Sequence, residues 1–326
     1  MSPAPAPEIP ARRAAIRMLI LCTGFWSVSF PIMKALSLEQ QRLLPGGDSW
    51  FLTAWGVMIR FGAAGLLLAL ALGRWWRQLS RRELEHGVVL AFFGAGGILL
   101  QMDGLNYTAA STSAFLTQGY SVLIPLWTAL LSRRWPAGKV LLSVLLVAGG
   151  AAVLAGVDFK SFRLGRGELE TLAGSVMFAG QILALEHPRY AGNHALRFSA
   201  VMFLAMAFFS APLVWLTIPS GAACGQALAS VPAAGFMTVL VLVCTLGGYL
   251  VMNRWQCGVT ATEAGLIYSI EPVFASVLAL FLPAWLSAWT GIAYANEQFT
   301  LRLLIGGGFI TAANVILQSR WLGRKS

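Results

Sequence analysis

The sequence predicts an all-α integral membrane fold, in which ten transmembrane helices form two inverted five-helix repeats. Three observations predict it: a low content of charge, apolar runs about as long as a bilayer is thick, and basic residues concentrated in alternate loops. Of the 326 residues, 57% are hydrophobic and 11% are charged, and the mean hydropathy is +0.71. Because soluble domains carry about a quarter charged residues, we expect lipid to be the main solvent and no separate soluble domain.

Ten apolar runs have about the length of a membrane span. A helix rises about 1.5 Å per residue, so about 20 residues cross the hydrocarbon core. The runs are bounded by charges, Pro or Gly, and they predict spans at roughly 16–36, 52–72, 87–107, 112–131, 140–156, 169–186, 197–218, 231–252, 264–285 and 301–319. Each half of the chain therefore holds five predicted spans.

The ends of these runs define the expected domains. We expect a disordered cytoplasmic tail over 1–15, a first repeat over 16–156, a linker over 157–168, a second repeat over 169–320 and a cytoplasmic tail over 321–326. The N-terminal tail is rich in Pro and Ala and lacks large apolar side chains that could pack. The first apolar run has no clear small-x-small cleavage site, which favours an uncleaved span over a signal peptide.

Basic residues set the predicted orientation, because short cytoplasmic loops are enriched in Lys and Arg. Most of the 23 Lys and Arg residues fall on one side if both termini are cytoplasmic, although Lys160, Arg163 and Arg166 argue against this. We therefore expect a multi-pass protein of a bacterial inner membrane. The formal charge of +10 is then directed at the bilayer surface, and no nucleic-acid partner is expected.

An odd number of spans per half means that a duplicated second half enters the membrane the opposite way round. The loop after the second span holds four Arg, whereas its counterpart after the seventh, PSGAACGQALASV, holds none. At an offset of 150 residues, identical residues pair the fourth span with the ninth: Thr112, Ala114, Leu116, Ala129 and Leu130 with Thr262, Ala264, Leu266, Ala279 and Leu280. These signals together favour an inverted repeat.

Three segments carry a resemblance to a known family: FWSVSFPIMKAL over 25–36, GLNYTAASTSAFLTQGYSVLIPLWTALLSRRW over 104–135 and IEPVFASVLAL over 270–280. The chain resembles the EamA-type members of the drug/metabolite transporter superfamily over roughly residues 16–320. It departs from their usual pattern at Asp103, where an uncharged residue is common. A long segment also replaces the usual short turn after the ninth span, although Glu297 keeps the Glu that commonly ends that turn.

This resemblance implies a central cavity between the halves and alternating access, often in exporters of amino acids or other metabolites. We therefore expect transport, with export favoured, of a small metabolite such as an amino acid or an amphipathic compound. Proton coupling and a homodimer are left open. The alternative is a non-transporting membrane scaffold or sensor, which the apolar pattern does not exclude.

Enzymatic activity is not expected, because the sequence contains neither H-E-x-x-H nor G-x-S-x-G and its three histidines lie in or next to predicted cytoplasmic loops. The chain also lacks G-x-x-x-x-G-K-[ST], which argues against ATP use. The four cysteines show no C-x-x-C spacing. We expect no cofactor, no metal site and no disulfide.

Ionisable groups at membrane depth cost about 2.5–3.5 kcal/mol each on insertion scales and usually have a partner. Arg60 lies about 12 Å and Asp103 about 6 Å below the predicted outer boundary, at about 1.5 Å per residue. We hypothesise that they pair at a cavity and contact a charged or zwitterionic substrate. The alternatives are a structural ion pair, or an Arg60 that reaches the outer headgroups.

Polar side chains recur at helical spacing on the third and fourth spans. Asp103, Asn106 and Tyr107 are spaced i, i+3 and i+4, and Thr117 and Tyr120 follow the same rule near Gln118. Such groups orient a substrate in an apolar pocket, or they hydrogen-bond neighbouring helices. Both readings stay open.

Glu271 is the sharpest feature of the second half. Tyr268 precedes it by three residues, and Pro272 follows it directly. Because proline has no backbone N–H, it permits a local break that frees a carbonyl. The carboxylate and this carbonyl are predicted to bind a proton or a substrate amine, with a polar contact to a neighbouring helix as the alternative.

Trp26, Ser29 and Pro31 mark the first span, and Phe178 with Gln181 lies at the pseudo-equivalent place on the sixth. They either line the pathway or pack. Glycines at 94, 96, 97, 149, 150 and 306–308 are expected to bring helices close together. Lys34, Glu186 and Glu263 lie near span ends, and solvated interface residues are favoured over gate charges.

Overall fold

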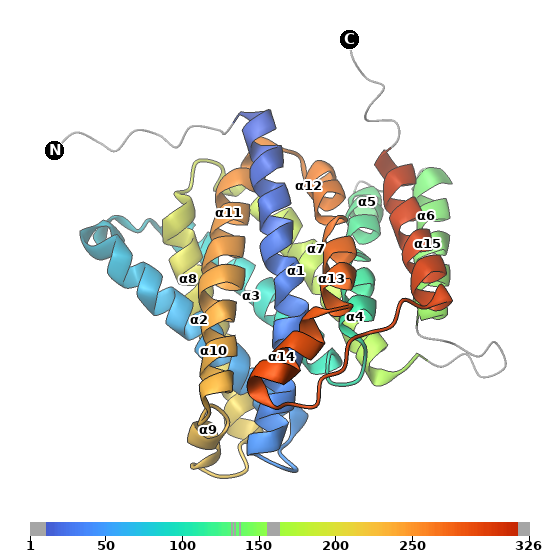
Figure 1. Cartoon of the computed structure of the whole chain (residues 1–326). Helices are drawn as coiled ribbons and strands as arrows, with labels where there is room; N and C mark the ends of the chain where they lie inside the picture. The colour runs from blue at the N-terminus through green and yellow to red at the C-terminus, as the bar shows by residue number, and fades with distance from the viewer. Residues whose placement is uncertain (1–10, 132, 134, 137, 155–163, 319–326) are drawn as a thin grey trace.

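The computed structural model describes residues 11–131, 133, 135–136, 138–154 and 164–318, in which every regular element is a helix (Figure 1). Most of the predicted N-terminal tail and linker, and all of the predicted C-terminal tail, lie outside these residues. The helix α1 already begins at Arg12 and so takes up the end of the predicted tail. Disorder in the tails stays a prediction.

The first half of the described chain contains six α-helices and one short 3-10 helix. They are α1 (Arg12–Leu43), α2 (Ser49–Leu72), η1 (Gly73–Gln78), α3 (Arg81–Gly104), α4 (Ala110–Thr117), α5 (Tyr120–Leu131) and α6 (Gly138–Leu154). Asp48 caps α2 by accepting from Trp50 N and Phe51 N, and Ser80 and Glu83 form a capping box at α3.

The second half contains nine α-helices and three shorter or irregular segments. They are α7 (Arg166–Leu185), η2 (Pro188–Tyr190), α8 (Ala195–Thr217), α9 (Ala223–Gln226), α10 (Val231–Val239), η3 (Leu240–Gly247), α11 (Gly248–Trp255), η4 (Gln256–Gly258), α12 (Ala261–Tyr268), α13 (Glu271–Ala279), α14 (Leu282–Thr290) and α15 (Leu301–Gln318). The segment η3 is π-helical and joins α10 to α11 within one continuous span.

By length and composition, five described helices can cross a membrane: Arg12–Leu43, Ser49–Leu72, Arg81–Gly104, Ala195–Thr217 and Val231–Gly258. A sixth is added if α13 and α14, bent by 50°, count as one span. The helices α6 and α15 are apolar but shorter. The described part of the chain is therefore all-helical, with the spans of a multi-pass membrane protein, and the finer count of ten spans stays a prediction.

Two predicted spans are interrupted. The helix predicted over 112–131 divides between α4 and α5 at Gln118 and Gly119, and the one predicted over 264–285 divides between α12 and α13 at Ser269 and Ile270. Pro272 stands in the first turn of α13, where its missing N–H leaves no helical bond unmade. The long segment expected after the ninth span, over 283–300, is not a loop throughout, because α14 occupies Leu282–Thr290.

Helices from the two halves interleave. The helix α2 packs on α8, α3 on α7 and α8, and α6 on α15, while α1 contacts α11 and α13. Glycines permit these helices to approach closely, because they have no Cβ. A Cβ on Gly65 would lie 2.8 Å from Leu204 Cδ2, and one on Gly87 would lie 2.6 Å from Val201 Cβ. The start of α1 and the end of α15 lie at the same end of the bundle (Figure 1).

Candidate functional site

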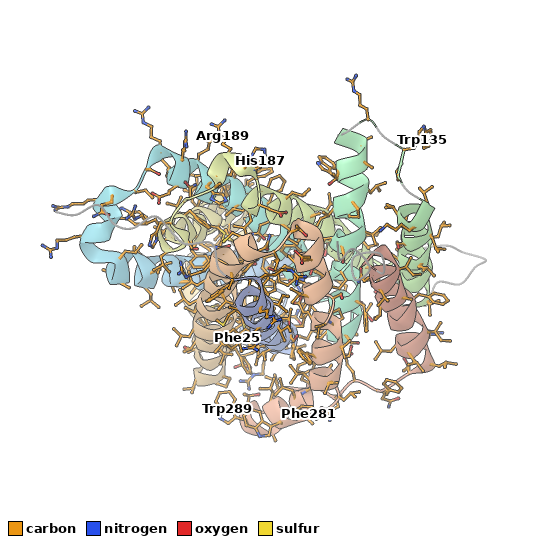
Figure 2. All side chains as sticks on the ribbon, turned by 90° about the horizontal axis from the view of Figure 1, so that it is seen from above. Phe25, Trp135, His187, Arg189, Phe281 and Trp289 are labelled. Atoms are coloured by element: carbon orange, nitrogen blue, oxygen red, sulfur yellow. The ribbon has the colours of Figure 1, made fainter. Side chains whose placement is uncertain are left out.

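A cavity lies among α1, α2, α3, α7, α11 and the two interrupted helices. With its mouth it holds about 540 Å³ of space not occupied by protein atoms. Its lining combines two charged side chains with aromatic, amide and apolar groups: Trp26, Ser29, Phe30, Arg60, Ile98, Gln101, Thr117, Tyr120, Phe178, Gln181, Ile182, Tyr249, Met252, Tyr268 and Glu271. In the view from above, side chains crowd the middle of the bundle around α1 (Figure 2).

Arg60 reaches this cavity from α2 and is only 1% exposed. Its Nε donates to Thr245 Oγ1 at 2.7 Å, and its Nη1 lies 3.4 Å from both Ser29 Oγ and Met33 Sδ. The guanidinium carbon stands 5.2 Å from the centroid of the Phe61 ring. Among the described residues Arg60 forms no ion pair, so no carboxylate compensates the positive charge that it presents at the cavity.

The predicted pair between Arg60 and Asp103 is wrong. Asp103 is fully buried, but its Oδ2 accepts from Arg166 Nη2 at 2.6 Å and its Oδ1 accepts from Thr53 Oγ1 at 3.3 Å. The prediction compared depths along the helices and not the directions of the side chains. Asp103 stands in the last turn of α3, where its carboxylate meets the first residue of α7.

Asn106 and Tyr107 do not share a helical face with Asp103 either, because α3 ends at Gly104 and both residues lie in the following turn. The Asn106 side chain accepts from Gln41 Nε2 at 3.2 Å and from Ser37 Oγ. Tyr107 is 46% exposed, and its ring stacks under Arg166 with a centroid distance of 4.2 Å. Tyr107 belongs to a surface cluster around Arg166 and Asn106 bonds to α1, so neither residue is part of the cavity lining.

Glu271 begins α13 directly after the second interruption and is 5% exposed. Its Oε2 accepts from Gln118 Nε2 at 3.4 Å, and the same nitrogen donates to Tyr268 O at 3.0 Å. Ser27 Oγ donates to Glu271 O at 3.0 Å. No ion pair reaches Glu271 from any described residue, and Gln118 links the two interrupted helices across the cavity wall.

Aromatic rings build one wall of the cavity. The Trp26 centroid lies 5.4 Å from those of both Tyr249 and Tyr268. Tyr268 also donates from Oη to Gln256 Oε1 at 2.8 Å, so it both lines the cavity and ties helices together. Thr117 does the same, because its Oγ1 accepts from Gln101 Nε2 at 2.9 Å. The two readings of these polar groups are thus not exclusive.

Gln181, the remaining predicted site residue, is 3% exposed and lies in the lining, with Nε2 3.4 Å from Leu90 O. Sequence reasoning missed Arg166, Thr245 and Tyr249. Thr245 and Tyr249 are spaced i and i+4 inside the apolar run VLVLVCTLGGYL. Two polar side chains on one face of an apolar helix could have identified this face as part of the site. Arg166 was read as a loop charge, whereas it is the first residue of α7.

The charges predicted near span ends make specific contacts. Lys34 donates from Nζ to Thr108 O at 3.1 Å, Glu186 Oε2 accepts from Ala261 N at 2.6 Å, and Glu263 pairs with Arg12 at 2.7 Å. Lys34 is half-buried and Glu263 is buried, whereas Glu186 is exposed. Only Glu186 therefore has the exposure expected of a solvated interface residue.

Comparison with known proteins places the first half of the chain. Residues 13–156 match the model of the EamA-like transporter family. Among solved structures, one described as "Crystal structure of protein" aligns with 96% of this chain and 100% of its own, at 19% identity and a TM-score of 0.60, which supports the fold alone. A search of curated proteins found no match. This match over residues 13–156 agrees with the resemblance to the drug/metabolite transporter superfamily that the sequence predicts.

Proposed function

We propose that this protein is a secondary transporter that exports a small zwitterionic or amphipathic metabolite, such as an amino acid, across a bacterial inner membrane. The observation that carries the proposal is the cavity with two buried, oppositely charged side chains. Arg60 and Glu271 both line it, and neither has an ion-pair partner among the described residues. A passive scaffold gains nothing from two such charges at membrane depth.

The lining suggests the chemistry of the substrate. A ligand with a carboxylate near Arg60 and an ammonium group near Glu271 would compensate both buried charges. The aromatic wall of Trp26, Tyr249 and Tyr268 suits an apolar or planar remainder. Such a substrate matches the walls of the cavity without any cofactor.

The helix boundaries support ten spans in an inverted repeat. The helices α4 and α12 each contain eight residues and start at Ala110 and Ala261, which are 151 residues apart. Each is followed by a two-residue interruption, and α5 and α13 then start at Tyr120 and Glu271, again 151 residues apart. This spacing differs by one residue from the offset of 150 that the sequence identities favour.

Close contacts at glycines follow the same spacing. A Cβ on Gly97 would lie 2.6 Å from Phe178 Cε1, and one on Gly248 would lie 2.5 Å from Trp26 Nε1. Gly97 and Gly248 are 151 residues apart, and Trp26 and Phe178 are 152 apart. Each half therefore seats an aromatic side chain of its first helix against a glycine on the third span of the other half.

Alternating access in this bundle requires movement within the halves, because their helices interleave and cannot separate as rigid bodies. The two interruptions at Gln118–Gly119 and Ser269–Ile270 are the natural hinges, since no helical hydrogen-bond ladder crosses them intact. Both hinges border the cavity. With both termini cytoplasmic, α4 and α13 lie on the external side of the hinges, and α5 and α12 lie on the cytoplasmic side.

Glu271 is also the proposed site of proton coupling. A buried carboxylate without a cation is stabilised by taking up a proton, and a substrate ammonium group would displace that proton. We expect transport to be driven by a pH gradient in the wild type. Collapse of the gradient with an ionophore that leaves the flux unchanged would refute coupling but not transport.

The test of transport is flux in proteoliposomes. The purified protein would be reconstituted and assayed for uptake and efflux over a panel of radiolabelled amino acids and amphipathic drugs. We expect flux of at least one compound that, at a substrate concentration below KM, is strongly reduced in Glu271→Gln and Arg60→Gln and retained in Glu85→Gln, whose carboxylate is 39% exposed and remote from the cavity. No flux of any compound in either direction would favour the scaffold.

A further inference from the structure

The interrupted helices associate as two pairs of half-helices. The helix α4 packs on α13, and α5 packs on α12. In Figure 1 the pair α4 and α13 lies farther from the start of α1 than the pair α5 and α12 does. We call α4 with α13 the outer pair and α5 with α12 the inner pair, following the orientation of the proposed function. The cavity residues Thr117, Tyr120, Tyr268 and Glu271 stand at the junction between the pairs.

One residue outside both helices of the outer pair holds them together. The Glu297 carboxylate accepts from Ala110 N at 2.7 Å, from Ser111 N at 3.4 Å and from Ser111 Oγ, all at the start of α4. Its own backbone N donates to Ala279 O, in the last residue of α13, at 2.9 Å. Glu297 thus joins the first turn of one half-helix to the last turn of the other.

This contact is physically strong. A carboxylate at a helix N-terminus satisfies unpaired backbone N–H groups and interacts favourably with the helix dipole. Hydrogen bonds to an ionised acceptor are roughly twice as strong as neutral ones. If the outer pair opened, water would have to replace Glu297 at Ala110 and Ser111.

The segment that carries Glu297 is fixed to α14. Ser287 Oγ donates to Tyr294 O at 2.6 Å, and Ala284 N donates to Asn296 Oδ1 at 2.8 Å. Trp289 of α14 packs edge-on against Phe236 with centroids 5.9 Å apart, and Trp289 stands at the rim of the bundle in Figure 2. The segment 282–300 is therefore a strap with its own anchor, and Glu297 lies near its end.

The inner pair is held differently. The first N–H of α12 goes to Glu186 at the end of α7, and Glu263 of α12 pairs with Arg12 of α1. Within the described ranges, no carboxylate joins α12 to α5. The two pairs are therefore unequal, because among the described residues a carboxylate joins the two helices of the outer pair and none joins the two helices of the inner pair.

We infer that Glu297 is the clasp that keeps the outer pair closed, so that its release opens the cavity to the outer face alone. The inference rests on the proposed function for the meaning of opening and closing. It assigns a gating role to the strap 282–300 and makes Glu297 a positioning residue that does not touch the substrate.

The test is the sided accessibility of the cavity, which needs no substrate. Cys22, Cys224, Cys244 and Cys257 would be replaced by Ala, and Ile98→Cys would place one thiol in the cavity lining. A membrane-impermeant methanethiosulfonate would be applied to right-side-out and to inverted vesicles. Glu297→Ala should raise the labelling rate about tenfold in right-side-out vesicles, as the loss of about 1.4 kcal/mol of closure predicts, and leave inverted vesicles unchanged.

Two further variants test whether the effect is specific to the contact between Glu297 and α4. Ser111→Ala removes one donor and keeps both backbone donors, so it should raise the outer rate by a smaller factor in the same direction. Asp48→Ala is the matched control, because Asp48 caps the uninterrupted α2 and joins no half-helices. An unchanged rate in Glu297→Ala, an equal rise from both faces, or an equal rise in Asp48→Ala would each overturn the clasp. A sided rise without flux of any compound would keep the clasp and refute transport.

Discussion

The two interrupted helices have the same geometry and different chemistry. Each consists of eight helical residues, a two-residue interruption and a second helix. The first residue after the interruption is Tyr120 in one and Glu271 in the other, and both line the cavity. The shared pattern builds the wall, and the difference supplies its charge.

The same contrast holds between α2 and its packing partner α8. Arg60 projects from the middle of α2, whereas the middle of α8 reads FLAMAFFSAP and carries no charge. The partner of Arg60 is Thr245 in the π-helical η3, while α3, the third span of the first half, is α-helical throughout. π-Helical turns are frequent at functional sites. The proposed function therefore depends on residues at which the two halves differ.

The strongest test of this contrast compares substitutions at Glu271 and at Tyr120, the two residues that follow the interruptions. Glu271→Gln should reduce the initial rate of flux about 100-fold or more, because removal of one partner from a buried charged contact costs about 2–5 kcal/mol. Tyr120→Phe should reduce it by about fivefold at most, since a neutral hydrogen bond contributes only about 0.5–1 kcal/mol. Similar losses in both variants would show that the charge difference between the halves is unimportant.

Arg60→Gln should raise the KM of the transported compound about 30-fold while its expression and folding stay normal, as the loss of a charged hydrogen bond of about 2 kcal/mol predicts. Arg60→Lys should recover part of the affinity, because it keeps the charge without the planar fork. The comparison is with Asp103→Asn, which should leave KM within about threefold because Asp103 faces Arg166. A large effect of Asp103→Asn would restore the pairing that the sequence suggested.

Substitutions at Gly97 and Gly248 test a feature that the halves share, the close contact of a glycine with an aromatic ring of the other half. Gly97→Ala and Gly248→Ala should each lower the free energy of unfolding by about 1–3 kcal/mol, because the added Cβ overlaps Phe178 or Trp26. Gly308→Ala is the control, since a Cβ there meets no atom within 4 Å. Thermal unfolding in detergent would measure all three. A loss at only one of Gly97 and Gly248 would break the internal symmetry.

The smallest expected effect concerns Thr245. Thr245→Val keeps the shape of the side chain and removes the acceptor for Arg60 Nε, so KM should rise about fivefold, as expected for about 1 kcal/mol. Thr245→Ser retains the hydroxyl and should restore the wild-type KM. If Thr245→Val instead lowered only the amount of folded protein, Thr245 would be a packing residue and η3 would have no role at the cavity.

Much of the fold was predictable because membrane helices follow simple rules of length and apolar content. The predicted spans over 52–72 and 197–218 agree closely with α2 and α8. The interruption before Glu271 was also predictable, since Pro272 cannot donate a backbone hydrogen bond. The interruption at Gln118 and Gly119 was missed, because no proline lies within or directly beside it and the sequence resumes as an apolar run after Ser121.

The candidate site was predictable in its residue types and not in its pairings. Depth along a helix follows from residue number, so Arg60, Asp103 and Glu271 could be identified as charges within spans. The direction of a side chain depends on how the helices are rotated against each other, and that is set by tertiary packing. Asp103 therefore met Arg166, which the sequence assigned to a loop, and Thr245 was recognisable only beside Arg60.

The interleaving of the halves has a consequence for biogenesis. During synthesis α2 and α3 enter the membrane before α7 and α8 exist, so the glycine faces at Gly65 and Gly87 remain open to lipid until the second half emerges. The first half therefore cannot complete the packing of α2 and α3 until the second half has been inserted. Co-expression of two separate halves should yield a folded protein, whereas either half made alone should be degraded.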